Sequence, residues 1–198
     1  MTQEILILFY SPGGTTAEMA NIIARGVEEV DGVQARLRTV PPVSPTSEQT
    51  TANIPEAGPL YASLDDLVEC DGLILGCPTH FGNMPAAMKF FIDNTSALWM
   101  GGKLAGKPAA VFSASSSMHG GQESTLLTMM LPLLHHGMLI VGLPYTETEL
   151  FNTKTGGSPY GATRLTDDLE ATPLSADEHK LCLAIGRRVA STAKKLSQ

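Results

Sequence analysis

Two glycines between hydroxyl side chains form the stretch of this sequence best suited to binding a ligand. They lie between Ser11 and Thr16, after an apolar run and before a helical pattern. Glycines let a ligand approach the backbone, while hydroxyls and the free amides at a helix start donate hydrogen bonds to an anion. The stretch can therefore hold a phosphate group without a lysine. The alternative interpretation is a tight turn that caps a helix.

The better-known phosphate motifs are absent from the sequence. It contains neither G-x-x-x-x-G-K-[ST] nor G-x-G-x-x-G, which excludes the nucleotide P-loop and the dinucleotide fingerprint. Two further loops rich in small and polar residues follow apolar runs directly, at residues 78–85 and 113–123. We therefore expect three candidate binding loops, each at the end of a strand.

Apolar runs alternate with helical patterns five times along the chain. Apolar runs at residues 6–10, 72–77, 107–112 and 138–142 predict parallel strands covered on both faces, and residues 33–40 alternate apolar and polar side chains, as an edge-side strand would. We expect an open α/β sheet in a single domain spanning residues 1–198. Ligands bind such sheets beyond the carboxyl ends of the strands, where all three loops would lie. Residues 41–59 and about thirty residues after 142 lack a regular pattern and are expected to be long loop insertions.

Composition narrows the class of protein. A net charge of -7, with no cluster of lysine and arginine, argues against a nucleic-acid ligand. The odd number of cysteines, Cys70, Cys77 and Cys182, suits reduced core thiols better than disulfides or a metal site, which points to the cytoplasm. No apolar run reaches the roughly 18 residues that a membrane helix needs.

Four motifs that follow one another along the chain are together more specific than any one of them alone. They are Pro-Thr-His-Phe-Gly-Asn-Met at 78–84, Gly-Gly-Gln-Glu-Ser-Thr at 120–125, His-His-Gly-Met at 135–138 and Gly-Gly-Ser-Pro-Tyr-Gly-Ala-Thr at 156–163. Together they resemble the WrbA family of NAD(P)H:quinone oxidoreductases over essentially the whole chain. The resemblance implies a flavodoxin-like, doubly wound, five-stranded parallel sheet in the order 2-1-3-4-5, with helices on both faces and long loop insertions. It also implies flavin mononucleotide (FMN) as cofactor, NADH or NADPH as co-substrate, and a homotetramer (a dimer of dimers) whose pockets are completed by neighbouring subunits.

The same resemblance assigns roles to individual residues. The FMN phosphate would be held by Ser11, Pro12, Gly13, Gly14, Thr15 and Thr16. The flavin ring and ribityl chain would lie against Pro78, Thr79, His80, Phe81, Gly82, Ser115, Ser116, Ser117, Met118, His119, Gly120 and Gly121. His135 would stand near the flavin and is the candidate for proton delivery to the quinone, and Phe81, Trp99 and Tyr145 would wall the substrate cavity. For His135 the alternative is a helix-end histidine favoured by the dipole, and for Trp99 it is a core or interface anchor.

The chain departs from the commonest pattern of that family at three places. Gly13 stands where an aromatic residue is often found, and His80 replaces an arginine, so that a fixed cation becomes a titratable group. The stretch before Gly120 is one residue longer than in some members and lacks their glycines. These changes bear on cofactor affinity and nicotinamide preference more than on the reaction.

The sequence therefore predicts an FMN-dependent enzyme that reduces quinones to hydroquinones with NADH or NADPH in a two-electron, ping-pong cycle. Flavin carries the redox chemistry, so no metal and no nucleophile are required. A flavodoxin-type electron-transfer protein without its own nicotinamide-dependent activity is the alternative. A regulatory partner of a transcription factor is a third reading, which the family name suggests and the residues do not support.

Overall fold

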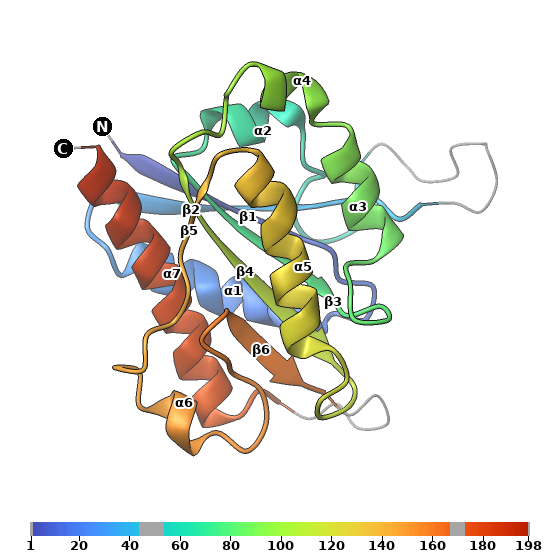
Figure 1. Ribbon diagram of the computed structural model, residues 1–198, viewed down its shortest axis with the longest axis vertical. Helices are drawn as coiled ribbons and strands as arrows, with labels where there is room; N and C mark the ends of the chain where they lie inside the picture. The colour runs from blue at the N-terminus through green and yellow to red at the C-terminus, as the bar shows by residue number, and fades with distance from the viewer. Residues whose placement is uncertain (1, 44–53, 167–172, 198) are drawn as a thin grey trace.

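A parallel sheet of six strands organises the computed structural model, which describes residues 2–43, 54–166 and 173–197 (Figure 1). The strands are β1 (Gln3–Phe9), β2 (Val33–Thr39), β3 (Gly72–Pro78), β4 (Pro108–Ser115), β5 (Leu139–Ile140) and β6 (Ala162–Leu165). Their order is β2-β1-β3-β4-β5, with β6 also paired to β4. The predicted flavodoxin-like order 2-1-3-4-5 is confirmed.

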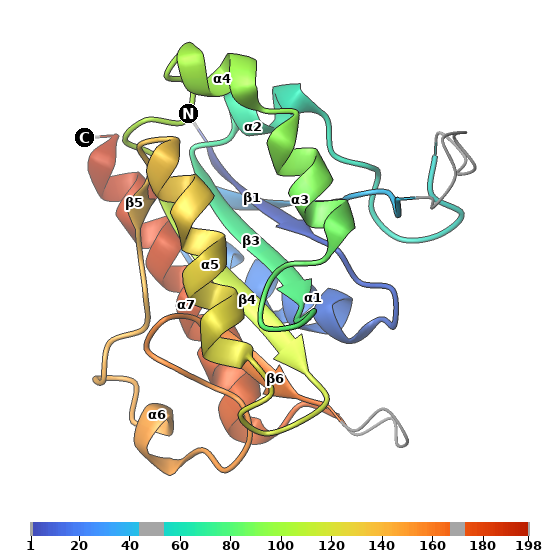
Figure 2. The same ribbon diagram turned by 45° about the vertical axis from the view of Figure 1, so that its right-hand side comes forward.

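Helices cover both faces of this sheet, as Figure 2 shows from a second side. They are α1 (Thr15–Glu28), α2 (Leu64–Glu69), α3 (Ala86–Asp93), α4 (Ser96–Met100), α5 (Gln122–His135), α6 (Glu149–Asn152) and α7 (Ala176–Leu196). Helices α1 and α7 pack on one face, and α2, α3 and α5 pack on the other. None of the helices in the described ranges is long and apolar enough to cross a lipid bilayer.

The central strand β1 shows why the apolar run folds as a strand. Alternate side chains of a strand point to opposite faces. Ile5 and Ile7 therefore enter the core under α1 and α7, while Leu6 and Leu8 enter the core under α3 and α5. All four are at most 1% exposed. A strand buried on both faces needs a continuous apolar run, which β1 has.

The long stretch after β5 is not irregular throughout, and here the expectation was wrong. It contains α6 and β6, and β6 pairs with the second half of β4 while β5 pairs with the first half. The chain leaves this edge of the sheet after Ile140 and returns to it at Ala162. Strand β6 has the sequence Ala-Thr-Arg-Leu, with buried Thr163 and Arg164, so no apolar run marks it. Of the other predicted insertion, residues 44–53 lie outside the described part of the chain.

Two glycines allow α1 and α7 to touch backbone to backbone. A methyl group added at Gly26 would overlap the carbonyl oxygen of Leu183, and one added at Gly186 would overlap the carbonyl oxygen of Ile23. Neither atom can rotate away, because both belong to helix backbones. This close crossing fixes α1, whose first turn follows the loop of residues 11–14.

We predict that Gly186→Ala lowers the free energy of unfolding by about 2 kcal/mol, measured by urea denaturation. Separating two packed backbones costs about 3 kcal/mol, and alanine recovers about 1 kcal/mol of helix propensity. The matched control is Gly13→Ala, because a methyl group there meets no atom within 4 Å. Equal midpoints for the two variants would show that the helices tolerate a wider crossing.

Candidate functional site

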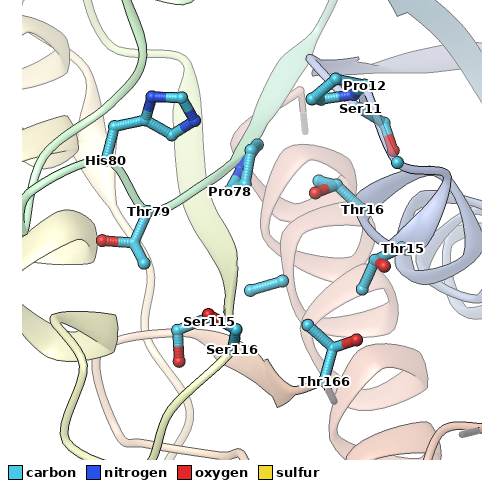
Figure 3. A pocket seen from close by; sticks show the side chains of 12 residues that line it. Ser11, Pro12, Thr15, Thr16, Pro78, Thr79, His80, Ser115, Ser116 and Thr166 are labelled. Atoms are coloured by element: carbon cyan, nitrogen blue, oxygen red, sulfur yellow. The ribbon is translucent and has the colours of Figure 1, made fainter. Parts of the chain in front are cut away.

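A cavity of about 280 Å³ opens at the carboxyl ends of β1, β3 and β4 (Figure 3). Its walls come from the three predicted loops and from the residue that follows β6. The lining residues are Ser11, Pro12, Gly13, Thr15, Thr16, Pro78, Thr79, His80, Ala114, Ser115, Ser116 and Thr166. Ten of these twelve are residues that the sequence predicted as cofactor contacts.

The loop after β1 presents unpaired donors at the start of α1. Gly14, with φ +83°, precedes the helix and supplies no side-chain cap. Ser11 Oγ accepts the hydrogen bond of the Ala17 amide at 3.0 Å, whereas the amides of Thr15 and Thr16 have no partner among the described residues. These two donors lie at the positive end of the helix dipole, an arrangement that favours an anion.

The loops after β3 and β4 contact each other on the opposite side of the cavity. The Thr79 amide donates to the Ala114 carbonyl at 2.8 Å, and the Thr79 and Thr125 hydroxyls lie 2.7 Å apart. A Cβ at Gly121, where φ is +100°, would come within 2.8 Å of Gly82 Cα. Glycine is therefore required at position 121 for the two loops to meet.

Two residues of these loops hold backbone angles that are rare outside glycine. Phe81 has φ +53° and His119 has φ +59°, conformations that cost energy and cluster at ligand sites. The Phe81 side chain is fully exposed, so no residue in the described part of the chain covers it. An aromatic ring held out beside a cavity is suited to contact a ligand or another chain.

Thr166 is a lining residue that the sequence did not reveal. It follows β6, and its amide donates to the Ser115 carbonyl at 2.8 Å. The buried carboxylate of Glu178 accepts the amides of Gly156 and Leu165 at 2.8 and 2.9 Å, which ties the insertion to α7. Ser175 and Glu178 also form a capping box at the start of α7, and that local pattern gives no sign that Glu178 holds β6 as well.

The other predicted cofactor contacts flank the cavity without lining it. They are Gly14, Phe81, Gly82, Ser117, Met118, His119, Gly120 and Gly121. These eight belong to the same three loops, so the structure brings every predicted cofactor contact except His135 to one edge of the sheet.

His135, Trp99 and Tyr145 do not reach this cavity within one chain. Helix α5 begins beside the cavity and runs 14 residues away from it, which places His135 about 20 Å along the helix axis. Trp99 lies on α4, at the amino-end edge of the sheet near the end of α5 (Figures 1 and 2). Tyr145 lies in the insertion, where its ring centroid is 4.9 Å from that of Phe151. Their predicted roles at the flavin stay predictions.

The electrostatics of the cavity are simple. His80 is the one titratable side chain among the lining residues, all of which the structure describes, and no lysine or arginine lines the cavity.

Cys77, at the end of β3, is fully buried with its Sγ 3.2 Å from Met129 Sδ, and burial raises the pKa of its thiol. The thiol stays protonated and packs. In the described ranges, no three His, Cys, Asp or Glu side chains gather into a group that could hold a metal ion.

Comparison with known proteins gives the same picture. The model of the family described as "NADPH-dependent FMN reductase" matches residues 4–149. The chain is 41% identical to the NAD(P)H dehydrogenase (quinone) of Syntrophobacter fumaroxidans, over 98% of this chain and 99% of that protein. Among solved structures, a flavodoxin-like, WrbA-like protein from Agrobacterium tumefaciens has a TM-score of 0.70 at 24% identity and covers 98% of both chains. A flavodoxin from the domain Archaea has a TM-score of 0.64 at 18% identity, covering 97% of this chain and 99% of its own.

The two solved structures show that the fold is shared, whereas the relative with 41% identity shows the family. The resemblance to WrbA proteins that the four motifs indicated is confirmed by these matches. Because the family model matches about three quarters of the chain, and the curated relative aligns along nearly all of it, the chain belongs to the NADPH-dependent FMN reductase family.

Proposed function

We propose that this protein is an FMN-dependent NAD(P)H:quinone oxidoreductase that transfers two electrons per cycle by a ping-pong mechanism. The relative with 41% identity is named for that reaction. The observation that carries the proposal is the hydroxyl-lined cavity with two unpaired amides at the start of α1. FMN ends in a phosphate, and these are neutral donors of the kind that bind phosphate at helix starts.

The residues around the cavity fit FMN along its length. The Thr15 and Thr16 amides and the hydroxyls of Ser11 and Thr16 would hold the phosphate. Ser115, Ser116 and Thr166 offer further polar groups for the ribityl chain. His80, which lines the cavity, and the exposed Phe81 next to it in sequence would contact the ring. When bound, FMN supplies the redox chemistry, taking two electrons from NADH or NADPH and passing them to the quinone. The chain's own part is to orient the reactants and to supply polar groups.

We further infer that His135 and Trp99 act at the cavity of a neighbouring subunit in a homotetramer. Both side chains are exposed at the edge of the sheet opposite their own cavity. Helix α5 also carries an apolar stripe of Leu127, Leu131 and Leu134, which are 44%, 60% and 55% exposed. Stripes at this helical spacing need a partner surface. His135, placed next to that stripe, would then donate a proton or hydrogen bond to the quinone.

A cytoplasmic location is part of the proposal. Cys70, Cys77 and Cys182 are all free and buried, as in proteins of reducing compartments.

We predict that the purified protein oxidises NADH or NADPH with benzoquinone only when FMN is present. Under anaerobic conditions, stopped-flow absorbance should show saturation in both substrates and parallel lines in double-reciprocal plots, the pattern of a ping-pong cycle. If FMN binds but the nicotinamide is oxidised only after a partner reductase is added, the chain is a flavodoxin-type electron carrier.

Thr16→Val should raise the Kd for FMN about tenfold and leave the Kd for riboflavin unchanged, as measured by flavin fluorescence. Thr16 is 1% exposed, so valine fills the same space and removes only the hydroxyl, and one hydrogen bond contributes about 1 kcal/mol or slightly more. The control is Thr128→Val, whose hydroxyl bonds only to the Thr125 carbonyl of its own helix. Equal weakening for both flavins would mean that the hydroxyl does not contact the phosphate.

Leu131→Glu should reduce the size of the assembly in sedimentation velocity, because it puts a charge into the apolar stripe of α5. Quinone kcat/KM should fall at least about tenfold as neighbouring residues are lost from the cavity. Leu196→Glu is the control, since Leu196 is 54% exposed on α7, which covers the other face of the sheet. An unchanged sedimentation coefficient for Leu131→Glu would contradict the assembly proposed here.

A further inference from the structure

A hydrogen bond at the edge of the sheet opposite the cavity joins α4 to the end of α5. His136 Nε2 lies 2.8 Å from Thr95 Oγ1, and Thr95 is 3% exposed. The Thr95 hydroxyl donates its hydrogen to the Ile92 carbonyl at 2.6 Å. Because that hydrogen is already used, His136 Nε2 must be the donor to Thr95, which assigns the tautomer with hydrogen on Nε2.

The other ring nitrogen of His136 lacks a polar partner in the described part of the chain, and His136 lines a small apolar cavity. Its Nδ1 is buried and has no hydrogen-bond partner among the described residues. The small cavity beside the ring is lined, apart from Thr95, by Leu8, Leu67, Leu73, Leu75, Phe91, Ile92, Leu104 and Leu133. No carboxylate is among these walls, and the neighbouring titratable group is His135. A proton on Nδ1 would have no acceptor, and burial, followed by the nearby His135, lowers the pKa of His136.

The bonded pair connects the two side chains that the proposed function assigns to a neighbouring subunit. The amide of Trp99 donates to the Thr95 carbonyl at 3.1 Å, so Thr95 holds the start of α4. His136 directly follows His135 and caps α5. Trp99 thus lies one helical turn after Thr95, and His135 lies immediately before His136, so both are close in sequence to the same hydrogen bond. Both side chains remain exposed.

We propose that Thr95 and His136 are positioning residues whose hydrogen bond presents Trp99 and His135 as one rigid unit to the cavity of a neighbouring subunit. This inference rests on the proposed function, in which those two side chains contact the quinone or the nicotinamide. Neither Thr95 nor His136 touches the reactants. Their effect passes through the relative placement of α4 and the last turn of α5.

The first test uses Trp99, the single tryptophan of the chain, as an optical reporter. Thr95→Val keeps the side-chain volume and removes the hydroxyl that accepts the hydrogen bond of His136. The variant should shift the Trp99 emission maximum and lower quinone kcat/KM about tenfold, while the Kd for FMN stays unchanged. Thr95→Ser, which restores the hydroxyl, should recover both values. Thr128→Val, the same change at a hydroxyl that bridges no elements, should alter neither.

The second test uses pH. Because the folded pKa of His136 lies below its ordinary value, the stability from the neutral ring is complete above about pH 6.5 and is lost as pH falls through the lower folded pKa. The wild-type Trp99 emission should change across that window. His136→Gln, which keeps a donor toward Thr95 and cannot titrate, should abolish the change and retain quinone reduction.

The outcomes separate this inference from the proposed function. If the wild-type protein reduces quinone and Thr95→Val has the same quinone kcat/KM and Trp99 emission, the positioning role is wrong and the proposed function stands. A shifted Trp99 emission with unchanged quinone kcat/KM also overturns it, because the bond would then be structural only. A wild-type chain that oxidises no nicotinamide with quinone and FMN removes the proposed function, and the positioning role with it.

Discussion

In a parallel sheet every strand ends at the same edge, and this constraint decides where each functional group of the chain lies. Strands β1, β3 and β4 are neighbours, so the loops that follow them form one cavity. Each helix after such a loop must then run back to the opposite edge before the next strand begins. Helix α5 therefore carries its last residue, His135, as far from the cavity as the sheet allows. A site that combines the loops at one edge with His135 from the other edge would therefore require a second subunit.

Two of the three departures from the common family pattern, those at positions 13 and 80, line the cavity. Gly13 leaves open space, since a methyl group there would meet nothing within 4 Å, and His80 lines the cavity at the position where the family resemblance implies an arginine. Phe81, next to His80 in the sequence, is fully exposed. With the wall at position 13 removed, a nicotinamide above the flavin would depend more on Phe81 and on the neighbouring subunit.

The family resemblance implied the strand order, whereas most of the cavity follows from local patterns in the sequence. Buried apolar runs mark β1, β3 and β4, and glycines and hydroxyls mark the loops that follow them. Thr166 could not be found in this way, since β6 is held by Glu178 and by pairing with β4, which are contacts between distant residues. The distance of His135 from the cavity could have been predicted from the sequence. A helix of about 14 residues is about 20 Å long whatever its tertiary setting.

The loop of residues 11–16, which we propose holds the FMN phosphate, offers neutral donors only. The chain carries a net charge of -7, and the buried Arg164 near the cavity pairs with Glu18 of α1, so the field at the loop is not strongly positive. Neutral amides and hydroxyls bind a phosphate through the direction of their hydrogen bonds more than through long-range attraction. Binding of this kind depends little on salt and leaves much of the affinity to the flavin ring. Under the proposed function, the contacts of the ring would then decide how firmly the cofactor is held.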